Sequence, residues 1–125
     1  MKCYIVDTSV FVEFLRGRPN QSFEALVREN RVVLSNFVRL ELILGARKAE
    51  SEKLARALSG LIVLKPDHRI FLAAEKILSA VRPKGLTLGV VDLLIAAESH
   101  LSGFPVYSYD KVFKSIASTK LIGAV

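Results

Sequence analysis

The sequence predicts an α/β domain of three layers, in which helices cover both faces of a central, mainly parallel sheet of four to five strands. Of the 125 residues, 51% are hydrophobic and 24% are charged, a balance typical of a globular domain with a substantial core. Short apolar runs recur along the chain, and segments with helical spacing separate them. Continuous apolar runs are typical of parallel strands buried on both faces. No linker-like change of composition interrupts the chain, so we expect one domain over residues 1–125.

The first half of the chain predicts two strands and four helices. Residues 3–6 are strand formers, and the helix that follows over 8–16 ends at a turn rich in Gly and Pro. Apolar side chains recur every three or four positions in the other three helices, and "RVVLS" is the second strand. In chain order, these elements are a helix at 21–29, the strand at 31–35, and helices at 36–47 and 51–58.

The second half predicts three more strands and three more helices. "LIVL" at 61–64 is a short strand, and Asp67 is expected to cap a helix that ends before Pro83. The helix at 90–101 lies between Gly89 and Gly103. The chain then continues with a strand at 104–109, a short helix opened by Asp110 and a last edge strand at 121–125.

Charge and cysteine content narrow the class of function. Lys and Arg exceed Asp and Glu by 18 to 12, and a small domain with net charge +6 often binds nucleic acid. The single cysteine, Cys3, allows no internal disulfide and fits a cytoplasmic protein. We expect no signal peptide and no membrane span. His68 and His100 are too far apart in sequence to suggest a zinc site, and we interpret both as structural or surface residues.

Two acidic residues, Asp7 and Asp110, each stand between a predicted strand and a predicted helix. An aspartate at such a turn is either a helix N-cap or a ligand at the carboxyl end of the strand. The position alone leaves both interpretations open. Ser108, two residues before Asp110, is placed to orient a carboxylate or a water molecule.

Two further acids interrupt apolar helices. Glu41 shares a predicted helix face with Phe37, Val38 and Leu44, and Gly45 leaves room beside it. Asp92 stands in the apolar stretch "GVVDLLIAAES". A charge on an apolar helix is costly unless it is paired or bound to metal. The alternatives are an exposed Glu41 and an Asp92 held by the helix dipole.

The four acids Asp7, Glu41, Asp92 and Asp110 are therefore expected at one edge of the sheet, where parallel strands end. Converging carboxylates repel one another and need a counter-charge. Mg²⁺ and Mn²⁺ are hard cations that prefer oxygen ligands, and acid-only sites of this kind suit phosphodiester hydrolysis. By contrast, Glu13 is expected to pair with Arg16, and Asp67 to act as a cap only.

The chain resembles the PIN domain family, and within it the toxin ribonucleases of the VapC type. The resemblance covers nearly the whole chain and rests on four motifs in order: "VDTSVFV", "LSNFVRLELILGA", "VVDLLIAAES" and "VYSYDKVF". It implies an α/β/α fold and a Mg²⁺- or Mn²⁺-dependent endoribonuclease. It also implies ligand roles for the four acids, with Ser108 and either Thr8 or Ser9 as supporting hydroxyls. Val38 stands where many relatives have Thr.

Other classes fit less well. A haloacid dehalogenase-type phosphatase needs a second Asp where this chain has Ser9, a receiver domain needs paired acids, and no Gly-rich phosphate loop follows the first strand. A non-catalytic RNA-binding or interaction module of the same fold, an RNA-processing enzyme and a DNA-directed nuclease remain alternatives.

Partners are also implied. The helices between residues 21 and 58 carry many apolar side chains, which favours a self-association surface. The resemblance likewise implies a homodimer. It further implies a small cognate antitoxin whose Arg or Lys enters the acidic quartet in place of metal. The residues behind the self-association prediction are Phe23, Leu26, Phe37, Leu40, Ile43, Leu54 and Leu58.

Overall fold

The protein is built on a four-stranded, fully parallel sheet of strand order β3-β2-β1-β4, seen in a computed structural model that describes residues 2–125. Tyr4 and Ile5 of β1 pair with Val32 and Val33 of β2, which places β1 inside the sheet. The strands are β1 (Tyr4–Val6), β2 (Val32–Leu34), β3 (Ile62–Val63) and β4 (Val106–Tyr107). The α/β prediction is confirmed, because parallel strands need crossover connections and helices supply them here.

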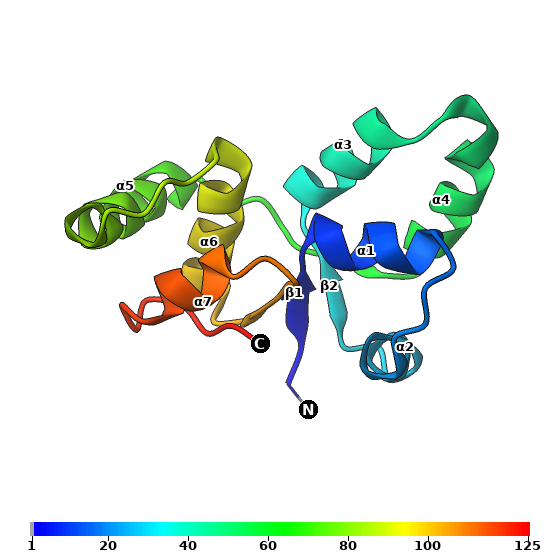
Figure 1. Cartoon of the computed structure of the whole chain (residues 1–125), viewed down its shortest axis with the longest axis horizontal. Coiled ribbons are helices and arrows are strands. Elements are labelled where there is room, and N and C mark those ends of the chain that lie inside the picture. The colour runs from blue at the N-terminus through cyan, green and yellow to red at the C-terminus, as the bar shows by residue number, and fades with distance from the viewer. Residues whose placement is uncertain (1) are drawn as a thin grey trace.

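Seven α-helices and two short 3-10 helices in the described residues surround this sheet. Figure 1 shows α5, α6 and α7 on one side of β1 and β2, with α1, α2 and α4 on the other. Helix α3 contacts both α1 and α6, so it bridges the two groups. The helices are α1 (Thr8–Leu15), α2 (Gln21–Arg28), α3 (Asn36–Gly45), η1 (Lys48–Glu50), α4 (Ser51–Leu58), α5 (Ile70–Val81), η2 (Arg82–Lys84), α6 (Val90–Ser102) and α7 (Val112–Ala117).

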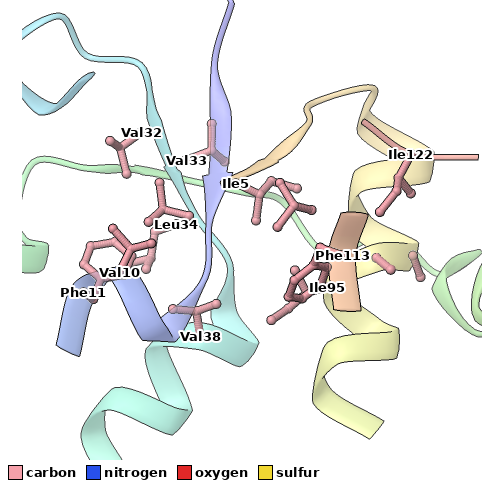
Figure 2. Packing of buried hydrophobic residues seen from close by; sticks show 14 of the residues in the cluster. Ile5, Val10, Phe11, Val32, Val33, Leu34, Val38, Ile95, Phe113 and Ile122 are labelled. Atoms are coloured by element: carbon pink, nitrogen blue, oxygen red, sulfur yellow. The ribbon is translucent and has the colours of Figure 1, made fainter. Parts of the chain in front are cut away.

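The hydrophobic core lies on both faces of the sheet. Ile5 and Val6 of β1 are completely buried, as expected for a central strand that alternates between two covered faces. Figure 2 shows Val10 of α1 to one side of β1, and Ile95 of α6 with Phe113 of α7 to the other. Because helices pack on both faces of the sheet, the carboxyl end of β1 has a fixed position, and so do the residues that follow it.

Polar side chains define where several helices begin. The Asn20 side chain accepts a hydrogen bond of 3.0 Å from the Phe23 amide and caps α2. Ser35 caps α3 in the same way through the amide of Phe37. Helix α6 ends at Gly103, whose φ of 79° lies in the left-handed region that favours glycine. These signals fix the ends of the elements that carry the candidate site.

Three local predictions need correction. Helix α5 begins at Ile70 rather than at an Asp67 cap; the Asp67 carboxylate instead accepts the Arg69 amide and pairs with its guanidinium. The last edge strand is reduced to one parallel bridge between Val106 and Ala124. Of the apolar residues assigned to a self-association surface, four lie in the core of this chain and one is half-buried, so only Leu40 and Ile43 are exposed.

Within residues 2–125, every helix is too short or too polar to cross a lipid bilayer.

Candidate active site

The four predicted acids all lie at the carboxyl edge of the sheet or on helices that face it. Asp7 directly follows β1, and Asp110 comes three residues after the end of the neighbouring strand β4. Glu41 lies in the middle of α3, the helix that bridges α1 and α6. Asp92 lies in the first turn of α6. Parallel strands all end at the same edge, so residues far apart in sequence reach one place.

Asp7 is almost completely buried, with 5% of its surface exposed. Its Oδ2 accepts hydrogen bonds of 2.7 Å from Ser108 and 3.0 Å from Ser9. Asp7 stands at the N-cap position of α1, but its side chain makes no capping hydrogen bond. Of the two interpretations left open for Asp7, the helix cap is therefore wrong. Two hydroxyls hold this carboxylate instead, and they leave its other oxygen, Oδ1, available to a ligand.

Glu41 is half-buried, and its Oε1 accepts a short hydrogen bond of 2.6 Å from the Thr8 hydroxyl. Thr8 is the residue after Asp7, so the first turn of α1 orients both carboxylates. The predicted apolar face around Glu41 is only partly correct, since Val38 is buried but Leu44 is 86% exposed. A Cβ added at Gly45 would meet no other atom, so the open space predicted beside it is present.

Asp92 carries the electrostatic signature of the site. The pKa of this half-buried carboxyl is raised to about 6. Burial is the largest cause, and the negative charges of Asp7, Asp110 and Glu41 add to it. Those three charges act on Asp92 only because they lie near it. The three other acids therefore lie within electrostatic range of Asp92, as the predicted convergence requires. A raised carboxyl pKa caused by burial and like charges is typical of functional sites.

Asp110 is exposed and helps to start α7. Its Oδ1 accepts a hydrogen bond of 3.0 Å from the Val112 amide, but Lys111 stands at the N-cap position of α7, so Asp110 precedes the helix rather than capping it. The Asp110 amide donates to the Ser108 hydroxyl at 2.9 Å, and that hydroxyl in turn donates to Asp7. Ser108 thus joins two acids of the quartet, which agrees with the orienting role expected for it.

Comparison with known proteins identifies the family. The family model described as "PIN domain" matches residues 4–118. The chain belongs to the PIN domain family. PIN domains are generally nucleases, and they typically use divalent metal ions. No curated protein matches the sequence significantly.

Solved structures show the same PIN fold at low sequence identity. A crystal structure of VapBC2 from Rickettsia felis, bound to a DNA fragment from its promoter, contains a chain with TM-score 0.83 and 22% identity, covering 98% of this chain and 97% of that one. DNA-bound VapBC from Salmonella typhimurium gives TM-score 0.79 and 22% identity, with 100% and 98% covered. FitAcB from Neisseria gonorrhoeae gives 0.72 and 21%, with 97% and 95% covered. These likenesses concern the fold.

The donors in this PIN domain suit a hard divalent cation. All are carboxylate oxygens, and a cation would relieve the repulsion that raises the pKa of Asp92. In residues 2–125, however, no three His, Cys, Asp or Glu side chains are already arranged to hold an ion. The two histidines are surface and structural residues, as expected. His68 is exposed, and Nδ1 of His100 is within hydrogen-bond distance of the Leu121 carbonyl oxygen.

Sequence reasoning overlooked two features of this PIN domain. Glu98 is a buried carboxyl on α6 that accepts a hydrogen bond from Ser35, and burial raises its pKa while that bond lowers it. It is absent from the charges that act on Asp92, so it lies apart from the quartet. The signal that selected Asp92, an acid in an apolar helix, applied equally to Glu98. The second feature is the ring of Tyr109, a residue between Ser108 and Asp110 that no periodic pattern singles out.

Proposed function

We propose that this PIN domain is a divalent-cation-dependent endoribonuclease that acts in the cytoplasm as the toxin of a toxin–antitoxin pair. The observation that carries the proposal is that Ser108 and Thr8 orient the carboxylates of Asp7 and Glu41 at the carboxyl edge of the sheet. Asp92 and Asp110 lie at the same edge, and the charges of the other three acids add to burial in raising the pKa of Asp92. Repulsion of this kind is costly to a fold and has no structural benefit. A site that binds cations to act on phosphodiesters gives it a purpose.

Each residue of the site has a distinct part in this proposal. Asp7, Glu41, Asp92 and Asp110 would hold Mg²⁺ or Mn²⁺, and the bound cation would supply an activated water and stabilise charge on the phosphate. Ser108 and Ser9 fix the Asp7 carboxylate through Oδ2. Support of this kind for ligating carboxylates commonly contributes about 10- to 100-fold to metal affinity or activity.

RNA is the proposed substrate. The net charge of +6 favours a polyanion, although four acids converge at the site itself. Basic side chains elsewhere on the surface therefore draw the strand in, while the cation neutralises the acids. The non-catalytic RNA-binding module is disfavoured because all four acids and their supporting hydroxyls are present. The RNA-processing enzyme and the DNA-directed nuclease are separated from the proposal by the choice of substrate.

A groove beside the quartet suits the antitoxin. It has a volume of about 460 Å³ between α1, α3 and α4, and Glu41 lines it together with apolar side chains such as Val12, Leu15 and Leu54. It is also lined by the charged side chains of Arg16, Arg47, Glu50 and Lys53. An amphipathic segment of the antitoxin would lie in this groove. An Arg or Lys on that segment would reach Glu41 and replace the cation, since a guanidinium donates a fork of hydrogen bonds to carboxylates. Gly45 lines the groove, and its missing side chain leaves space for this segment.

The outer face of α3 supports a homodimer. Leu40, Ile43 and Leu44 are 57%, 50% and 86% exposed. Their spacing of three and four residues places them on one side of the helix. Three neighbouring large apolar side chains in water favour association. We propose that two copies pair through this face of α3, next to Glu41.

A cleavage assay on purified protein tests the enzyme. Single-stranded RNA should be cut in Mg²⁺ or Mn²⁺, left intact in EDTA, and cut again when cation is restored. DNA of the same sequence should be cut much more slowly. The Asp92→Asn protein should stay folded and inactive, which excludes a contaminating nuclease. Cleavage at full rate in EDTA would overturn the cation requirement, and faster cleavage of DNA would overturn the substrate.

An expression experiment tests the biological role. Induction of the chain alone should stop growth and degrade RNA, and co-expression of the small protein encoded beside it should restore growth and co-purify with it. Normal growth under strong induction of active enzyme would instead favour an RNA-processing nuclease.

A further inference from the structure

Tyr109 is a large aromatic residue at the rim of the quartet. It lies between Ser108, which holds Asp7, and Asp110. Its side chain is substantially open, with 48% of the residue exposed. Most large aromatic side chains in a small domain bury their rings, because each ring contributes much apolar area. A half-exposed ring on the loop that also carries Ser108 and Asp110 therefore suggests a surface that a ligand covers.

Three contacts hold Tyr109 in place, one through its backbone amide and two through its side chain. Its amide donates a hydrogen bond of 3.2 Å to the Ser9 hydroxyl, and its phenol oxygen contacts the side-chain nitrogen of Asn20. Its edge packs against Tyr107, with ring centroids 6.5 Å apart and planes at 63°. An aromatic side chain fixed in this way loses little conformational freedom when it binds a ligand.

The anchors are themselves rigid. Asn20 caps α2 through the Phe23 amide and also donates to the Tyr107 phenol oxygen at 3.2 Å. Tyr107 belongs to β4 and packs edge-on against Tyr4 of β1, with centroids 6.3 Å apart. The open ring of Tyr109 is thus supported by the sheet and by the first turn of α2.

We propose that Tyr109 is a stacking platform for one base of single-stranded RNA beside the scissile phosphate. This inference rests on the proposed nuclease function and specifies its substrate as unpaired RNA. Bases in a duplex are stacked on their neighbours and present no free face, whereas an unpaired base can stack on a tyrosine. Stacking tolerates any base, so Tyr109 sets strandedness rather than sequence. The exposed Lys111, next to Asp110 in the chain, adds attraction for the phosphates.

Fluorescence binding provides the test, in full-length protein carrying Asp92→Asn so that the RNA survives. The probes are short uridine-rich strands in which 2-aminopurine replaces one base at a time, because its fluorescence falls when it stacks. Tyr109→Leu keeps apolar bulk without an aromatic face, and Tyr109→Phe keeps the ring without the Asn20 contact. Phe71→Ala is the matched control, because it removes another exposed aromatic side chain. Phe71 is 69% exposed near the start of α5, and its neighbour Ile70 lines a cavity together with residues of the last turn of α6.

We expect Tyr109→Leu to weaken RNA binding by about 5- to 150-fold and to abolish quenching at one probe position, as the loss of one stacked base predicts. Tyr109→Phe and Phe71→Ala should bind and quench like the parent, and a duplex should bind weakly in every variant. Equal binding and quenching by Tyr109→Leu would overturn the platform, as would a loss in Tyr109→Phe as large as in Tyr109→Leu, or no RNA binding by any variant.

Cleavage by proteins with Asp92 intact separates this inference from the nuclease proposal. If Tyr109→Leu cleaves with unchanged kcat/KM, the platform fails while the nuclease stands. If RNA binding depends on Tyr109 but the wild-type protein, with Asp92 intact, never cleaves RNA with any divalent cation, the nuclease fails while the platform stands.

Discussion

The Ser108 hydroxyl donates a hydrogen bond of 2.7 Å to Oδ2 of Asp7, which links the carboxyl ends of the neighbouring strands β4 and β1. The same hydroxyl accepts the amide hydrogen bond of Asp110. One serine therefore sets the positions of two acids that come from opposite ends of the chain. Its effect on the site should exceed its effect on the fold.

Ser108→Ala should lower cleavage by about 10- to 100-fold, as is typical when a group that supports a metal ligand is removed. The loss of two hydrogen bonds of the Ser108 hydroxyl, one to Asp7 and one from the Asp110 amide, should reduce the free energy of unfolding by only about 1 kcal/mol each. Initial rates across a Mn²⁺ titration, together with thermal unfolding, measure both effects. Ser59→Ala, at an exposed serine after α4, is the matched control and should change neither. Full activity in Ser108→Ala would show that Asp7 does not need this anchor.

Asp7→Asn should reduce cleavage by about two orders of magnitude or more, because the neutral amide binds a cation poorly. The protein should remain folded, since the amide oxygen can still accept the hydrogen bonds of Ser9 and Ser108. Asp67→Asn is the control. Asp67 is tied to Arg69 outside the quartet, so its replacement should leave cleavage near wild type. If both variants lost cleavage activity to the same extent, the four acids of the quartet would not differ in function from the other acids of the chain.

Asp92 should make the metal-free protein less stable as pH rises. Its folded pKa of about 6 exceeds the ordinary value of 3.8, so the folded state binds the proton more tightly. The proton's stabilising effect is complete below the ordinary pKa and is lost as pH rises through about 6. Solvent screening of this half-buried group limits the effect to about 1 kcal/mol.

Asp92→Asn should therefore raise the melting temperature of the metal-free protein at pH 8 by about 4 °C, and the gain should disappear in acid. Mg²⁺ should stabilise the wild type more than this variant, because a bound cation relieves the repulsion between Asp92 and the other three acids. Scanning calorimetry with and without cation measures both effects. A gain that is the same at all pH values would show that repulsion is not its cause.

Glu98→Gln provides a comparison on the same helix. Burial raises the pKa of Glu98, so the sign is the same as for Asp92: the stabilising effect of the proton is lost as pH rises through the raised pKa. Replacement by the neutral amide should raise stability in alkali, and the amide oxygen can still accept the Ser35 hydroxyl. Cleavage should be unchanged, because Glu98 lies outside the quartet. Loss of cleavage in folded Glu98→Gln would extend the site into the core.

The sequence carried most of the fold because the relevant patterns are local. The apolar runs of β1 and β2 and the spacing in α4 placed those elements within a residue of their observed ends. The quartet was accessible because each acid interrupts an apolar pattern. The failure of the cap interpretation of Asp7 could not be predicted, because Ser108, which holds its carboxylate, is 101 positions away. The exposure of Leu44 and the burial of Phe23 were also hidden, since helical spacing does not say how wide the covered face is.

The dimer proposal depends on the exposed face of α3, and Leu44→Glu tests it. Leu44 is 86% exposed in the isolated chain. If it packs against a second copy, its loss removes about 2 kcal/mol of apolar burial and adds an unpaired charge, so the dissociation constant should rise at least about 30-fold. Light scattering across a concentration series should show a wild-type dimer and a Leu44→Glu monomer. Val27→Glu, at an exposed apolar residue of α2, should leave the dimer intact.

The monomeric variant should keep its melting temperature in dilute solution, because Leu44 contributes little to the fold of one chain. A wild-type monomer at high micromolar concentration, or a Leu44→Glu dimer as tight as the wild type, would remove α3 as the dimer interface.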